Sequence, residues 1–77
     1  MKHLYDDTRA LSESLADAGF ARHAEQLVAT LSEGATGTEI FMILRSRLLD
    51  VIGDGTVPPK YKDEAERLRD IVVHALK

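Results

Sequence analysis

The segment from Ile40 to Ile52 constrains the fold more than any other part of the sequence. Nine of its thirteen residues are apolar, and on a helix they cover most of the circumference rather than a single stripe. Such a helix needs neighbours on several sides. The chain has 77 residues and no cysteine, so neither a disulfide nor a thiolate metal site is available to stabilise so small a domain. Helix packing, alone or with a second copy, has to supply the stability.

Two shorter apolar stripes precede this segment, one on each side of Gly19. The first consists of residues at steps of three and four: Leu4, Thr8, Leu11, Leu15 and Ala18. The second contains Phe20, Ala24, Leu27, Val28 and Leu31. In one straight helix the two stripes would face roughly opposite directions. We therefore expect the helix to end at Gly19 in a left-handed cap, because glycine adopts that conformation at little cost. A kinked, continuous helix is the alternative.

The wide apolar helix has a clear start signal. Thr36-Gly37-Thr38-Glu39 matches a capping box, in which Thr36 caps the helix and Glu39 reaches back to the N–H of the cap residue. Glycines at 34 and 37 bracket the preceding turn, and Gly53-Asp54-Gly55 ends the helix.

The last helix begins at Pro59, because proline is tolerated in a first helical turn. Its apolar stripe contains Tyr61, Ala65, Leu68, Val72 and Leu76. On its charged side we expect Asp63 to pair with Arg67 at i, i+4. The sequence thus predicts a single all-α domain over residues 1–77, a compact bundle of four short helices at about 4–18, 20–32, 37–52 and 59–76. We expect the third helix to be central.

On that third helix, Met42, Arg45 and Leu49 lie on the side away from Ile40 and Val51. Either the other helices cover this side, or it meets a second copy. Two interpretations also apply to Arg45. Its methylenes cover apolar surface while the guanidinium reaches water, or the guanidinium pairs with a carboxylate of this chain or of a second copy. We predict that these three residues form an interaction patch of a homodimer, and the sequence identifies no other protein partner.

Catalytic, metal and cofactor sites are not indicated by the residue pattern. His3, His23 and His74 have no i, i+4 pairing typical of a helical zinc site, and we expect each at the surface or its edge. The serines lack the context of a catalytic triad. The prediction is therefore a non-enzymatic protein without a cofactor.

DNA binding is the alternative function, through a helix-turn-helix formed by Leu15 to Leu31. The reading helix at 20–32 would offer Arg22, His23, Glu25 and Gln26. The net charge of −3 disfavours nucleic acid. No apolar run is long enough to span a membrane, and the N-terminus MKHLYDDTRAL has no apolar signal core. We therefore expect a cytoplasmic location without membrane contact.

Residues 34–49 and the pattern A-G-F-x-x-x-A-x-x-L at 18–27 resemble a small bacterial family of unassigned function. In that family a G-x-T-G-T-E-I block opens a helix after a short helical pair. The resemblance covers roughly the middle half of the chain and does not extend past Pro58. It implies a compact helical protein, and no activity can be transferred to particular residues.

Overall fold

The computed structural model describes residues 3–32 and 36–76. In these ranges the chain forms four α-helices and no strand: α1 (Leu4–Asp17), α2 (Ala21–Ser32), α3 (Gly37–Gly53) and α4 (Pro59–Leu76). The predicted all-α bundle of four helices is confirmed, and the predicted helix ends differ from these by at most one residue. The turn expected at Gly34 lies outside the described residues.

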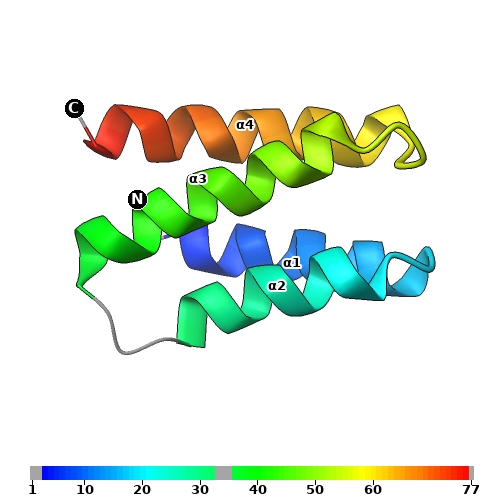
Figure 1. The fold of residues 1–77 in the computed structure, drawn as a ribbon, viewed down its shortest axis with the longest axis horizontal. Coiled ribbons are helices and arrows are strands. Elements are labelled where there is room, and N and C mark those ends of the chain that lie inside the picture. Colours follow the sequence, from blue (N-terminus) through cyan, green and yellow to red (C-terminus); the bar gives the residue numbers. More distant parts are fainter. Residues whose placement is uncertain (1–2, 33–35, 77) are drawn as a thin grey trace.

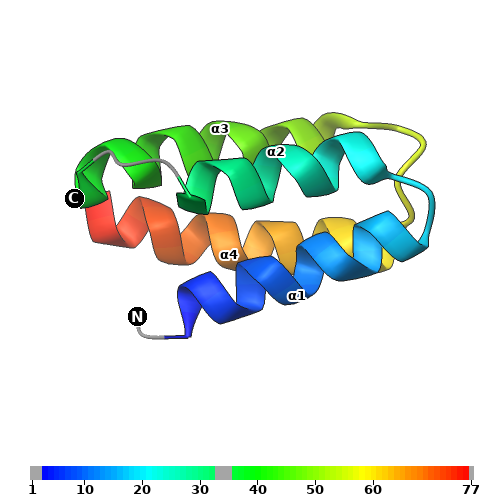
Figure 2. The same cartoon turned by 90° about the horizontal axis from the view of Figure 1, so that it is seen from below.

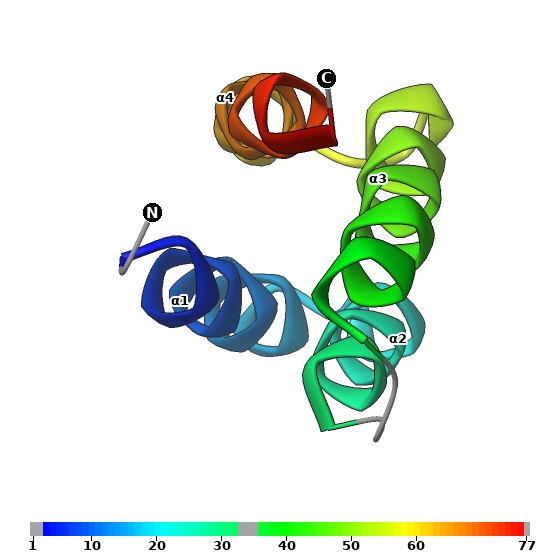
Figure 3. The ribbon, with the colours of Figure 1, turned by 90° about the vertical axis from the view of Figure 1, so that its left-hand side faces the viewer.

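The four helices run alternately in opposite directions along the long axis of the molecule (Figure 1). Seen from one end, they form a ring in the order of the sequence (Figure 3). In this ring α3 packs against α2 on one side and α4 on the other, more extensively than any other helix, which confirms its central position. The loosest edge of the ring is between α1 and α4.

The core fills the inside of this ring with one apolar stripe from each helix. Fully buried side chains come from all four helices: Leu15, Leu27, Leu44, Leu48, Val51, Leu68 and Val72. At one end of the bundle the rings of Tyr5 in α1 and Phe41 in α3 contact each other across the ring of helices. Their centroids are 6.5 Å apart in an edge-to-face arrangement. Three buried hydroxyls donate to backbone carbonyls: that of Thr8 to Leu4, that of Ser12 to Ala24 and that of Thr30 to Gln26.

Gly19 separates α1 from α2, as the two stripes require. Its φ is 95°, the left-handed region that side-chain-bearing residues rarely adopt. The N–H of Gly19 donates to the carbonyl of Ala16 at 3.1 Å, and the N–H of Phe20 donates to that of Leu15 at 2.8 Å. These two bonds define a Schellman motif. The alternative of a continuous helix is therefore wrong, and Phe20 packs against the core.

Thr36 is the N-cap of α3, with extended backbone and a side-chain oxygen that accepts from the N–H of Glu39 at 3.3 Å. This bond is one half of the predicted capping box, and Glu39 also places a negative charge in the first turn of the helix.

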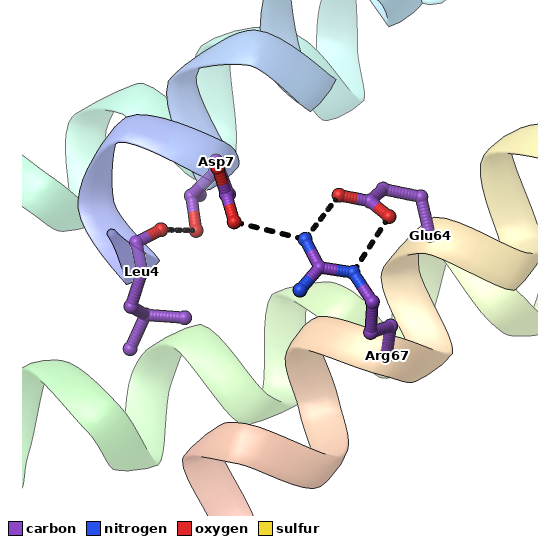
Figure 4. Close-up of polar contacts among 5 residues, drawn as sticks. Leu4, Asp7, Glu64 and Arg67 are labelled. Atoms are coloured by element: carbon purple, nitrogen blue, oxygen red, sulfur yellow. Dashed lines mark hydrogen bonds and ion pairs between the residues drawn. The ribbon is translucent and has the colours of Figure 1, made fainter. Parts of the chain in front are cut away.

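An arginine bridges the loose edge between α1 and α4. The guanidinium of Arg67 donates twice to Glu64, at 2.7 and 2.9 Å, and once to Asp7 of α1 at 2.9 Å (Figure 4). The expected pair between Arg67 and Asp63 is thus wrong. Arg67 donates instead to Glu64, three residues earlier in the sequence, and to Asp7, which the packing of α1 brings near.

Candidate interaction surface

The outer face of α3 carries an apolar strip that the bundle leaves uncovered. Met42 is 52% exposed and Leu49 is 44% exposed, and Arg45 between them is also exposed. We call these three residues the outer stripe. The helical period explains their position, because Ile40, Leu44, Leu48 and Val51 use the opposite face for the core. The sequence left open whether the other helices cover this side of α3 or whether it meets a second copy. The described helices of the single chain do not cover it.

Along one edge the outer stripe borders side chains that pack against the core. Phe41 and Ile52 lie between the stripe and the buried face on the helical circumference, and both are partly buried and packed against the core. The other exposed side chains of α3 include the uncharged Thr38 and Ser46 and the carboxylates Glu39 and Asp50. The stripe itself carries one cation and no carboxylate, and the two acidic residues lie beyond Met42 and Ser46 on the helical circumference.

Arg45 forms no ion pair within the part of the chain that the structure describes. Four other arginines, at positions 9, 47, 67 and 69, each have a carboxylate oxygen within 4.0 Å. For Arg45 the pairing with a carboxylate of the same chain therefore finds no support in residues 3–32 and 36–76, and the residue is exposed. Pairing with a second copy stays a prediction.

A second polar cluster lies between the start of α2 and the loop after α3. Nε2 of His23 lies 2.8 Å from Oδ2 of Asp54, and their side chains are 15% and 31% exposed. The other carboxylate oxygen of Asp54 accepts from the N–H and the hydroxyl of Thr56 at 2.9 and 2.7 Å. The bonds from His23 and then Thr56 hold the pKa of Asp54 well below its ordinary value.

The sequence did not indicate the His23–Asp54 pair. His3 and His74 are exposed and His23 lies at the edge of the surface, as expected, but the side chain of His23 is 15% exposed and has a partner. No local pattern around His23 indicates this bond, because its partner is 31 residues away in the sequence. The sequence indicates Asp54 only as part of the turn that ends α3.

The surrounding groove, of about 490 Å³, is lined mainly by polar side chains: Arg22, His23, Gln26, Arg47, Asp50 and Asp54. Arg47 and Asp50 lie 3.8 Å apart at its edge. The arginines and the aspartates balance each other, and none of the lining side chains carries a hydroxyl or thiol that His23 could activate. The His23–Asp54 pair thus connects α2 to the loop between α3 and α4.

The same groove bears on the DNA-binding alternative. A helix-turn-helix crosses its two helices at a steep angle, whereas α1 and α2 lie side by side and antiparallel (Figure 2). Of the four proposed reading residues, Arg22 and Glu25 are exposed, but His23 and Gln26 are partly covered beside α3. This arrangement gives the DNA-binding prediction no support.

No group of three His, Asp or Glu side chains in residues 3–32 and 36–76 is placed to hold a metal ion. Within the same ranges, no helix has both the length and the apolar character needed to cross a bilayer. No protein-family model, curated protein or solved structure matches the chain.

Proposed function

We propose that this protein is a small, non-enzymatic interaction module of the cytoplasm that pairs with a second copy of itself through the outer stripe of α3. The observation that carries the proposal is the exposure of Met42 and Leu49 on the helix that packs most extensively in the core. Because α3 is held between α2 and α4, the stripe is presented on a rigid support.

A second copy can supply the carboxylates that the outer stripe lacks. A twofold contact places the same stripe from each copy together. The stripe carries the cation of Arg45 and no carboxylate, but Glu39 and Asp50 are exposed on the same helix. The planar guanidinium of Arg45 suits either carboxylate at the rim of the contact.

The free energy of dimerisation through the outer stripe can be bounded. Full burial of a leucine or methionine side chain contributes about 1.5–3 kcal/mol, and Met42 and Leu49 are each already half buried. Four such side chains across a twofold therefore add about 4 kcal/mol. That gain is at the low end of the cost of association. Phe41, Ile52 and the methylenes of Arg45 add further area, so we expect a weak dimer whose dissociation constant lies between the upper micromolar and the millimolar range.

Analytical ultracentrifugation from micromolar to millimolar concentration tests the proposal with a matched pair of variants. Leu49 and Val28 are almost equally exposed, at 44% and 43%, but Val28 lies on α2. We expect the wild-type protein and Val28→Glu to dimerise, and Leu49→Glu to be a folded monomer, because the dimer would lose the apolar contacts of Leu49 and would have to desolvate a charged side chain in its place.

Two outcomes contradict this. A wild-type protein that stays monomeric up to millimolar concentration has no such interface. A Leu49→Glu variant that dimerises as the wild-type protein does would place the interface on another face, and α4 is then the first candidate.

A further inference from the structure

The turn between α1 and α2 depends on a single backbone conformation. Among the residues that the structure describes, only Gly19 has a positive φ. A Cβ at this position would meet no other atom within 4 Å, so the left-handed backbone, not steric crowding, favours glycine. The turn itself is short, because α1 ends at Asp17 and α2 begins at Ala21.

The two helices joined by this turn have buried faces that are out of phase. Leu4, Leu11 and Leu15 form the buried face of α1, and Ala24, Leu27 and Leu31 form that of α2. If residues 4–32 formed one straight helix, these faces would point in roughly opposite directions. Such a helix buries both faces only when it has a core on each side. A second copy of the chain supplies the second core.

The contacts that hold α1 in place can be remade between copies. Most are with α2, including the bond from the hydroxyl of Ser12 to the carbonyl of Ala24 at 2.8 Å. Towards α4 the packing is looser, and an open groove of about 520 Å³ lies between the two helices. The Asp7–Arg67 ion pair that bridges this edge is exposed. Only the Gly19 turn has no counterpart in an exchanged arrangement.

We propose that two copies of this protein can exchange α1 by opening at Gly19. In the exchanged dimer α1 and α2 join into one helix over residues 4–32, and the α1 segment of each chain packs into the bundle of the other. This exchange is distinct from pairing through the outer stripe, because it uses the core face of α1 and leaves Met42 and Leu49 exposed. Exchange of an identical element is a low-cost route to a dimer, and hinge substitutions favour it.

Gly19→Ala in a Leu49→Glu background tests the exchange without the outer-stripe dimer. Alanine disfavours the left-handed turn by about tenfold in each chain. Since the exchanged dimer loses both turns, its dissociation constant should fall by about a hundredfold. Alanine also favours the helical joint over glycine. The matched control is Gly53→Ala in the same background, because Gly53 also has free space for a Cβ but no positive φ.

The variants are warmed to the unfolding midpoint at high concentration, cooled, and examined by light scattering and small-angle X-ray scattering. The expected result is a dimer for Gly19→Ala and a monomer for Gly53→Ala. The joined helix would be about 43 Å long, compared with 30 Å for the longest extent of the single molecule, so the dimer should be visibly elongated. A Gly19→Ala variant that remains monomeric after this treatment, with a lowered melting temperature, overturns the exchange and leaves the outer-stripe proposal intact. A compact Gly19→Ala dimer would overturn it as well.

Discussion

At the scale of single residues, Asp54 connects two parts of the molecule. Its carboxylate accepts from His23 of α2 through one oxygen and from Thr56 of its own loop through the other. It therefore fixes the loop between α3 and α4 and joins that loop to α2. Each of these bonds favours the ionised form, which is why the pKa of Asp54 is lowered, first by His23 and then by Thr56.

This bonding predicts a specific acid sensitivity. The folded-state pKa of Asp54 lies below its ordinary value of 3.8, so the unfolded chain takes up the proton first as the pH falls. The contribution of Asp54 to the free energy of unfolding is therefore complete above about pH 4 and is lost as the pH falls further, towards the folded-state pKa. Unfolding of the wild-type protein and of Asp54→Asn should be compared from neutral pH to pH 2.

We expect the wild-type protein to be the more stable at neutral pH and this advantage to shrink only in the acid range. Asp63→Asn serves as the control, because Asp63 is exposed on α4 and has no ion pair within the described part of the chain. A constant difference between wild type and Asp54→Asn down to pH 2 would show that the carboxylate is not the titrating group.

The local features of the sequence were predictable where one helix or turn determines them. Gly19 and Thr36 follow from such rules, because a left-handed cap and an N-cap involve residues within one turn of each other. The His23–Asp54 bond was not predictable, since it exists only after α2 and the α3–α4 loop have packed. The wrong partner for Arg67 has this origin only in part: Asp7 is 60 residues away in the sequence, but Glu64 is three residues away, and helix spacing alone did not decide between it and Asp63.

At the scale of helices, the ring is unevenly closed. The edges α1–α2 and α3–α4 join helices connected by short turns, and α3 is held on both sides. The edge between α1 and α4 joins the first and last helices and is the loosest. Arg67 is placed at that edge, where its forked donors connect Glu64 and Asp7 (Figure 4). These two carboxylates, Glu64 first, raise the pKa of Arg67 above its ordinary value.

We expect the Asp7–Arg67 coupling energy to be about 0.5 kcal/mol, because the Arg67 side chain is 49% exposed and solvent screens exposed pairs. A double-mutant cycle of Asp7→Ala and Arg67→Ala, measured by urea denaturation, gives this coupling. It should decrease in high salt. Arg67→Lys is the control, because lysine keeps the charge without the planar fork that binds both carboxylates. A coupling of zero at low salt would mean that apolar contacts alone hold α1 against α4.

At the scale of the whole molecule, sequence periodicity determines the helices but not how completely they cover α3. The number and position of the helices followed from sequence periodicity, since each amphipathic stripe must face a common core. Periodicity also separates Met42, Arg45 and Leu49 from Ile40 and Val51, but it does not decide whether other helices cover that side, because nine apolar residues leave several directions open. The placement of α2 and α4 decides it, by covering Leu44 and Leu48 and leaving Met42 and Leu49 uncovered.

Two adjacent leucines on α3 make this division measurable. Leu48 is fully buried, whereas Leu49 is 44% exposed. Leu48→Ala removes buried methyl groups and leaves a cavity, so it should lower the free energy of unfolding by about 2–5 kcal/mol. Because a small domain has only about 5–15 kcal/mol in total, that loss would be a large part of its stability. Leu49→Ala removes atoms that already contact water, and we expect a loss below about 1 kcal/mol.

Both variants should be unfolded by urea at a concentration low enough that the wild-type protein is monomeric, because dimerisation would add to the apparent stability. At higher concentration the Leu49→Ala variant should lose the concentration-dependent part of its stability, since that part comes from the outer stripe. Leu48→Ala should keep it, because its cavity lies on the opposite face of α3. Equal losses for the two variants at low concentration would mean that both faces of α3 are buried within one chain, and the outer stripe would then have no free surface to offer a second copy.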